Sequence, residues 1–189
     1  MIDRLLETKF HTPLWRSDGV IRPRLLDQLQ AGLMEQRKLT LVSAPAGYGK
    51  TTLISSWLYS FPESTRNIWL SLEKSDNEPT RFLSYWVTAW NRISGFVLED
   101  ILELLDAPQL PPYQNILDEV INALAHLEEP TILVLDDYHI ITNPLIHEML
   151  EYFLERQPHQ AHLVITTRSD PPLPLVRLRA RANGRNSRL

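Results

Sequence analysis

The stretch Ala44–Thr52 reads APAGYGKTT and follows directly on the apolar run LTLV. A strand-length apolar run that leads through a Gly-rich turn into a helix is the setting in which phosphate-binding loops occur. Gly47 and Gly49 free the backbone to point successive N–H groups at an anion. Lys50 is placed to reach the outer phosphates, and the Thr51 hydroxyl to ligate Mg²⁺. These residues predict a nucleotide as the ligand.

Only one position departs from the usual pattern G-x-x-x-x-G-K-[ST], because Ala44 stands where the first Gly is usual. The segment after the loop, TLISSWLY, is predicted to be a helix whose positive N-terminal end faces the phosphates. The predicted nucleotide-binding residues are those of the loop and the start of this helix: Pro45, Ala46, Gly47, Tyr48, Gly49, Lys50, Thr51 and Thr52.

Outward from the loop, short apolar runs alternate with amphipathic segments along the chain. Strands are predicted at residues 39–43, 67–72, 131–135 and 162–166, and helices at 25–33, 52–59, from 79 or 80, around 98–105, at 116–127 and from 144. This alternation predicts an α/β fold, a parallel sheet with helices on both faces. The stripe Phe82, Trp86, Trp90 and Ile93 has helical spacing and is predicted to be core. After Leu178 the sequence contains no apolar run that would make another buried strand.

A pair of carboxylates, Asp136 and Asp137, ends the apolar run TILVL. Because parallel strands end at one edge of a sheet, the pair is expected to share a crevice with the phosphate loop. Asp136 and Thr51 would then hold Mg²⁺, and Asp137 would orient or deprotonate an attacking water. The alternative is that the two aspartates only cap a strand and begin a turn. Arg168 follows the run HLVIT and would contact the γ-phosphate, or else lie on the surface near Asp170.

Composition fits one soluble α/β domain and excludes several classes of protein. The chain has 189 residues, a formal net charge of -4 and no cysteine, so neither a disulfide framework nor a thiolate metal site is possible. No apolar run approaches the roughly 20 residues of a membrane span, and the N-terminus MIDRLLETKF is not a secretory signal. A cytoplasmic protein is therefore expected. The Arg-rich end is expected to be a solvated tail or a strip that meets another domain, rather than a nucleic-acid-binding segment.

Several segments together resemble one known family. They are LLETKFHTP, RPRLL, LTLVSAPAGYGKTTL, WLSLEKSDNEPTRFLSYW, LVLDDYHIITNP and LVITTRSDPPLPLVRLRAR, and they span residues 5 to 181. The chain resembles the N-terminal nucleotide-binding domain of MalT-like, large LuxR-type transcription regulators, which belong to the STAND class of signalling P-loop NTPases. The resemblance implies a three-layer ASCE-type core, ATP or ADP with Mg²⁺ as ligands, Asp136 and Asp137 as the Walker B pair, and Arg168 as sensor. It also implies that Arg22 and Arg24 lie near the nucleotide base.

Members of this family resemble ATP-driven switches, in which the ADP form is resting and ATP with an inducer permits self-association and transcription activation. Such a scheme needs at most a slow ATPase. The sensor and DNA-binding helix-turn-helix domains of full-length members are not legible here, so no specific DNA binding is expected from this chain and a fragment is expected. Its end RANGRNSRL departs from the family pattern where a fifth core strand should lie beside the phosphate-loop strand.

The expected organisation is an entry segment and helix at 1–37, the NTPase core at 38–178 and a basic, disordered tail at 179–189. Three functions fit this reading. The preferred one is an ATP-binding switch module without its sensor and DNA-binding domains. A free-standing P-loop phosphotransferase or ATPase would need an acceptor-binding lid, and no basic lid segment is recognisable between Leu72 and Pro130. A truncated remnant that binds no nucleotide is the third.

Overall fold

The structure is a computed structural model of the whole chain, and it describes residues 5–15, 22–62, 65–95, 98–105, 107 and 109–175, with the backbone of 187–188. The strands are β1 Leu39–Ser43, β2 Arg66–Ser71, β3 Thr131–Asp136, β4 Ala161–Thr167 and β5 Ser187–Arg188. The α-helices are α1 Pro23–Met34, α2 Lys50–Tyr59, α3 Pro79–Ser94, α4 Glu99–Leu105, α5 Tyr113–Ala125 and α6 Pro144–Arg156. Three short 3₁₀ helices are η1 Glu7–Phe10, η2 Lys74–Asn77 and η3 Tyr138–Ile140.

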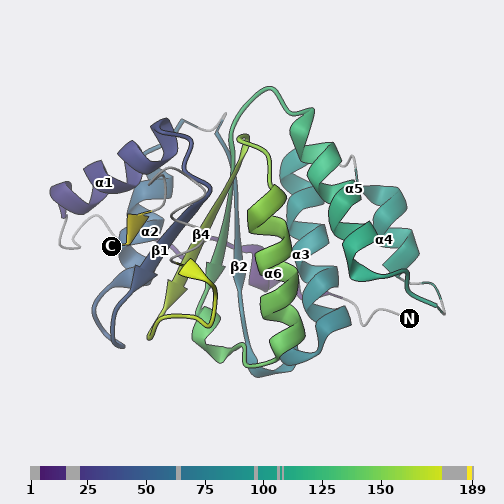
Figure 1. Cartoon of the computed structure of the whole chain (residues 1–189). Helices are drawn as coiled ribbons and strands as arrows, with labels where there is room; N and C mark the ends of the chain where they lie inside the picture. The colour runs from purple at the N-terminus through teal and green to yellow at the C-terminus, as the bar shows by residue number, and fades with distance from the viewer. Residues whose placement is uncertain are drawn as a thin grey trace.

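The strands form one parallel sheet in the order β2-β3-β4-β1-β5. Because β4 inserts between β3 and β1, the loops that follow these three strands emerge side by side. The register pairs Ser43 with Thr167 and Ser71 with Asp136, so the strands also end level with one another. The arrowheads in Figure 1 accordingly point to one edge of the sheet, where the loop between β1 and α2 lies.

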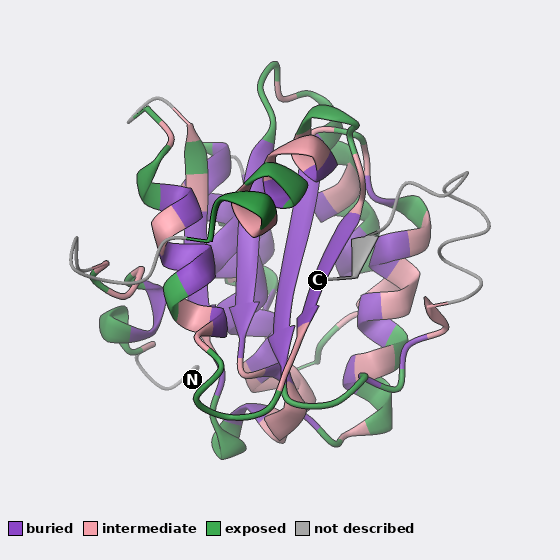
Figure 2. Ribbon diagram, turned by 90° about the vertical axis from the view of Figure 1, so that its left-hand side faces the viewer, coloured by how far each residue is buried: buried purple, intermediate pink, exposed green. Residues whose placement is uncertain are grey.

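Helices cover both faces of the sheet, which confirms the predicted three-layer α/β fold. In Figure 1, α1 and α2 lie on one side of the sheet, and α3 to α6 lie on the other. Alternate strand residues supply the two cores: Val134 packs with α1 and α2, whereas Leu133 and Leu135 pack with α3, α5 and α6. Strands buried on both faces read as continuous apolar runs, and β3 and β4 are buried along their whole length (Figure 2).

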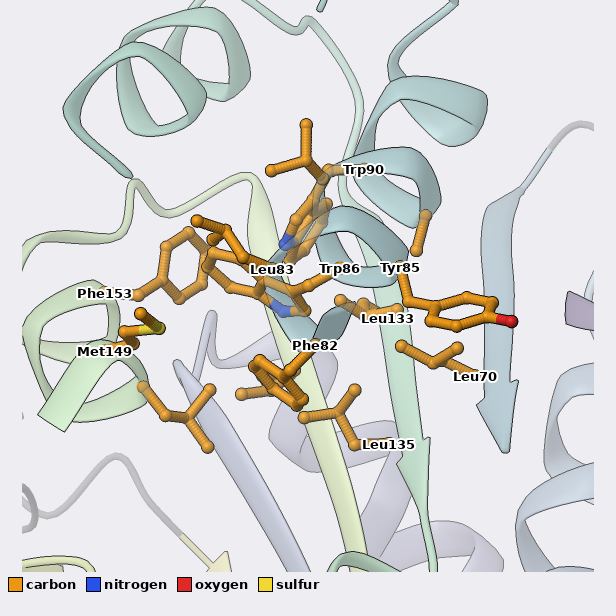
Figure 3. Close-up of a cluster of buried hydrophobic side chains, with 14 of the residues drawn as sticks. Leu70, Phe82, Leu83, Tyr85, Trp86, Trp90, Leu133, Leu135, Met149 and Phe153 are labelled. Atoms are coloured by element: carbon orange, nitrogen blue, oxygen red, sulfur yellow. The ribbon is translucent and has the colours of Figure 1, made fainter. Parts of the chain in front are cut away.

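The aromatic stripe of α3 lies in the larger core, as predicted. Trp86 and Trp90 are buried against Phe153 of α6, with ring centroids 4.6 and 5.6 Å from that phenyl ring (Figure 3). Tyr85 points to the opposite side of α3, toward Leu70 of β2. This packing fixes α3 and α6 over β2 and β3, and so holds rigid the elements that lead into the carboxylate edge.

Local signals place the helix starts. At the start of α6, the Asn143 side chain accepts a hydrogen bond from the backbone N–H of Leu145 at 3.0 Å, and Pro144 occupies the first helical position. The helix α2 begins at Lys50, two residues before the predicted start, directly after Gly49. Lys50 and Thr51 therefore lie on the first helical turn, which directs them toward the helix N-terminus.

Past Leu178 the sequence predicts no further buried strand, and the structure adds a short pairing of two residues at the edge of the sheet. Ser187 and Arg188 pair in parallel with Thr40 and Leu41 at the free edge of β1. A two-residue pairing uses backbone groups and needs no apolar run, so hydropathy gives no sign of it. The position beside β1 is the one at which the family pattern places a fifth strand. The other residues of the predicted tail, 179–186 and 189, lie outside the described residues, and its boundary stays a prediction.

Within the part of the chain that the structure describes, no helix is long and apolar enough to cross a membrane.

Candidate functional site

The loop between β1 and α2 has the backbone conformation that its glycines permit. Gly47 and Gly49 have φ angles of 82° and 78°, in the left-handed region that strains residues with a side chain. A Cβ on Gly47 would meet nothing within 4 Å, so the need for glycine there is conformational rather than steric. Gly49 precedes the first residue of α2, whose unpaired backbone N–H groups and positive dipole end face the loop.

Lys50 lies against the loop that it would serve. Its Nζ donates hydrogen bonds to the carbonyl oxygens of Ala44 at 2.8 Å and Pro45 at 3.2 Å, and its side chain is largely buried. The loop itself is anchored to the sheet, because the Ala44 N–H donates to the Thr167 carbonyl at 3.2 Å. The ammonium is thus held by two neutral carbonyls, with which the charged oxygens of a phosphate would compete effectively.

Asp136, the last residue of β3, is only 7% exposed and is surrounded by hydroxyl groups. Thr166 of β4 donates a hydrogen bond to its Oδ1, and the Thr51 hydroxyl of α2 lies 3.4 and 3.5 Å from its two carboxylate oxygens. Burial raises the pKa of Asp136 above its ordinary value. The fold therefore brings together the carboxylate and the hydroxyl that the sequence pairs as Mg²⁺ ligands, and both are the oxygen donors that Mg²⁺ prefers.

Asp137 differs from its neighbour in both backbone and exposure. Its φ of 59° and ψ of 38° are left-handed, and its N–H donates to the Thr166 hydroxyl at 3.0 Å. Its side chain is 42% exposed. The partly exposed carboxylate of Asp137 is suited to take a proton from water, whereas the buried carboxylate of Asp136 is suited to bind a cation.

Two residues near the carboxylates were missed by the sequence analysis. Thr166 bridges the two aspartates as described, and His139 places its Nδ1 3.6 Å from the Asp137 carboxylate. Burial lowers the pKa of His139, the Asp137 carboxylate opposes that shift, and the charges of Arg168 and Lys50 lower it further. The sequence signals that could have pointed to them are the position of Thr166 at the end of the run HLVIT and that of His139 two residues after Asp137.

The predicted arginines occupy different positions. Arg22, at the start of α1, is exposed, and its Nη2 lies 3.9 Å from where a Cβ on Gly49 would stand, so it reaches the phosphate loop. Arg168 directly follows β4 at the carboxylate edge and is exposed, and its charge is felt by His139. Arg24 is exposed in the first turn of α1, and the described residues give it no hydrogen bond or ion pair. Thr52 and the loop residues from Pro45 to Tyr48 are also exposed.

Comparison with known families agrees with this geometry. The model of the AAA domain family matches residues 33–169, which include the loop, both aspartates and Arg168. The chain belongs to the AAA domain family. The predicted P-loop NTPase identity is thereby confirmed.

Curated relatives of this AAA domain are regulators of transcription. The chain is 36% identical over 176 residues to the HTH-type transcriptional regulator MalT of Vibrio parahaemolyticus, a match that covers 93% of this chain and 19% of the relative. It is 37% identical over 177 residues to MalT of Cronobacter sakazakii, covering 94% of this chain and 19% of the relative. The similarity lies in the N-terminal region of these regulators, so the predicted relationship is confirmed and the chain spans about a fifth of their length.

Solved structures share the fold of this AAA domain at low sequence identity. Cdc6p from Pyrobaculum aerophilum matches 97% of this chain and 49% of its own, with a TM-score of 0.60 and 15% identity. A chain in the structure of Drosophila ORC bound to AT-rich DNA and Cdc6 matches 88% of this chain and 52% of its own, with a TM-score of 0.56 and 12% identity. These likenesses confirm the predicted class of fold.

Proposed function

We propose that this AAA domain is an ATP-binding switch module that binds Mg²⁺-ATP and Mg²⁺-ADP and hydrolyses ATP slowly. One observation carries the proposal: the Thr51 hydroxyl and the Asp136 carboxylate face each other at 3.4 to 3.5 Å, directly beside a glycine loop with Lys50 at its end. Phosphate-binding loops need such a carboxylate opposite the hydroxyl to hold Mg²⁺.

Each residue of the site has a distinct part in this proposal. The loop N–H groups and Lys50 would bind the phosphates, and Thr51 with Asp136 would hold Mg²⁺, which neutralises charge on the phosphates when bound. Asp137 would take the proton of an attacking water at its carboxylate. Arg168 would distinguish ATP from ADP through the γ-phosphate. Arg22 and Arg24 would lie near the nucleotide base, and Arg22 also reaches the phosphate loop at Gly49.

The switch role rests on the relatives. Since those relatives are MalT transcription regulators and the chain spans 19% of their length, the nucleotide state would act on other parts of a longer protein. Inducer binding, self-association and DNA binding would be functions of those other parts. The whole protein would act in the cytoplasm. Slow hydrolysis is sufficient for a switch, because it resets the state rather than supplying product.

Thermal unfolding with and without Mg²⁺-ADP and Mg²⁺-ATP tests the proposal. At a hundred times Kd, a ligand that binds only the native state adds about 2.7 kcal/mol to the free energy of unfolding, which raises Tm visibly. Lys50→Ala should abolish most of this rise, whereas the matched control Lys74→Ala, at an exposed residue of η2, should keep it. If nucleotide leaves the Tm of the parent chain unchanged, the chain is a remnant that does not bind nucleotide.

Hydrolysis is tested separately with Asp137→Asn. Loss of the proton acceptor should lower turnover about a hundredfold or more while the nucleotide-dependent rise in Tm persists. An unaltered turnover would exclude Asp137 as the base. Rapid transfer of phosphate to an acceptor other than water would favour the phosphotransferase alternative.

A further inference from the structure

Asn77, the last residue of η2, ties the end of β2 to the segment that follows the two aspartates. Its Oδ1 accepts hydrogen bonds from the N–H of Thr142 at 2.7 Å, the hydroxyl of Thr142 at 3.2 Å and the N–H of Asn143 at 3.2 Å. Its Nδ2 donates to the carbonyl of Ile140 at 2.9 Å and to that of Lys74 at 3.2 Å. The Asn143 amide in turn donates to the Asn77 carbonyl at 3.0 Å.

The segment held in this way is continuous with the proposed catalytic base. Asp137 has a left-handed backbone, a conformation that persists in a non-glycine residue only when its surroundings impose it. Its N–H is fixed by Thr166, and its carbonyl accepts the N–H of Ile140 at 3.0 Å. The Ile140 carbonyl then accepts the Asn77 amide. Asp137 is therefore fixed from β4 on one side and, through one turn of chain, by Asn77 on the other.

Asn77 is itself rigidly placed. The preceding residue, Asp76, is fully buried and forms ion pairs with Lys9 and Arg81. On the far side of the segment, the Tyr138 hydroxyl bonds to Nδ1 of His147 on α6 at 2.7 Å. The turn after Asp137 thus lies between two anchored elements, η2 and α6.

We propose that Asn77 is a positioning residue for ATP hydrolysis, which holds the turn of residues 138–143 so that the Asp137 carboxylate faces the phosphate site. This inference rests on the proposed function. An asparagine suits the task because its amide donates and accepts at once, which neither Asp nor Ala can do. Among the described residues, the hydrogen bonds of Asn77 go to Lys74 and to the segment 140–143, and none goes to the phosphate loop or Asp136. Its loss should therefore affect the rate of hydrolysis and leave binding of ADP intact.

The test compares three variants by ATP turnover and ADP binding. Asn77→Ala, which removes the side-chain bonds to Thr142, Asn143 and Ile140, should lower kcat by between about ten- and a hundredfold with KM and ADP affinity unchanged. Asn77→Asp keeps the acceptor and loses the donor, so its kcat should fall between those of Asn77→Ala and the parent chain. The control Asn67→Ala, which loses one bond to the nearby Thr65 carbonyl at 3.1 Å, should keep the parent kcat.

Amide hydrogen exchange gives a readout that does not depend on turnover. The N–H groups of Thr142 and Asn143 should exchange faster in Asn77→Ala, which removes their acceptor Oδ1. They should exchange near the parent rate in Asn77→Asp, which keeps that acceptor, and in the control. A parent kcat in Asn77→Asp and in every folded Asn77→Ala preparation overturns the positioning role alone. A parent chain that neither binds nor hydrolyses ATP overturns the proposed function and the positioning role with it.

Discussion

Two buried aspartates lie near the ends of neighbouring strands, and the groups that contact their carboxylates differ in charge. Asp76, in η2 after β2, is fully buried, and its carboxylate forms ion pairs with Lys9 and with Arg81 at 3.3 Å. Asp136, at the end of β3, is 7% exposed, and its carboxylate meets the hydroxyls of Thr51 and Thr166. Within the described residues, no Lys, Arg or His nitrogen lies within 4.0 Å of the Asp136 carboxylate.

The difference separates a structural carboxylate from one that is suited to a ligand. Around Asp76 the charges are balanced inside the protein, and the Lys9 ammonium also lies 4.1 Å from the centroid of the Tyr85 ring. This network fastens η1 of the N-terminal segment to α3. Around Asp136 the hydroxyls satisfy hydrogen bonds but supply no positive charge, so burial raises the pKa of Asp136. A bound cation would supply the missing charge.

The largest expected effect comes from removing the charge of the structural carboxylate. Asp76→Asn should lower the free energy of unfolding by about 3–5 kcal/mol, because Lys9 and Arg81 are left without their shared buried partner. Chemical denaturation at constant pH measures this. Asp27→Asn, at an exposed residue of α1, is the control and should change stability by less than about 0.5 kcal/mol. A variant as stable as the control would show that the network contributes nothing net.

His162, a buried base, extends the comparison to the dependence of stability on pH. His162 of β4 is buried, its Nδ1 lies 2.6 Å from the Arg37 carbonyl and its Nε2 3.1 Å from the Thr40 hydroxyl, and burial lowers its pKa to about 4. The unfolded chain therefore binds a proton between about pH 6.5 and 4 that the folded chain does not. Stability from this group is complete above pH 6.5 and falls as the pH drops, by about 3 kcal/mol in all.

Denaturation curves at several pH values between 4 and 7 measure this slope. His162→Gln removes the titrating group and should flatten the dependence, whatever its effect on stability at neutral pH. An equally steep slope in the variant would assign the dependence to other groups, of which Asp136 is not one, since its raised pKa makes stability fall as the pH rises.

The sequence gives far clearer signals for the candidate phosphate and Mg²⁺ site than for the network around Asp76. Apolar runs revealed four of the strands, and a glycine loop after one and aspartates after another are local patterns that a parallel sheet necessarily brings to one edge. Lys50 is an intermediate case. The motif predicts that it binds phosphate, but its hydrogen bonds to the loop carbonyls are seen only in the structure.

The network around Asp76 gave no such signal. Asp76 and Asn77 lie in the polar stretch EKSDNEP, which has the composition of an exposed loop. Arg81 is only five residues from Asp76, but the contacts with Lys9, Ile140 and Asn143 join residues 63 to 67 apart in sequence. Only the folded chain brings these together. Lys9 is a charged residue that a hydropathy pattern places on the surface, yet it is 6% exposed. Charge pairing across the fold, rather than local pattern, decides these positions.

The smallest expected effect on stability comes from Asp136, the proposed Mg²⁺ ligand. Asp136→Asn should change the free energy of unfolding by at most about 1 kcal/mol without ligand, because the amide oxygen still accepts a hydrogen bond and the buried carboxyl is replaced by a neutral group of similar shape. Its effect should emerge with nucleotide, when the rise in Tm that depends on Mg²⁺ is lost and the rise with ADP and a chelator remains. A loss of stability as large as that of Asp76→Asn would make both aspartates structural, and an undiminished Mg²⁺ effect would place the ion elsewhere. Because the two variants make the same chemical change at carboxylates of similar burial, they test directly whether the counter-charge sets the role of each.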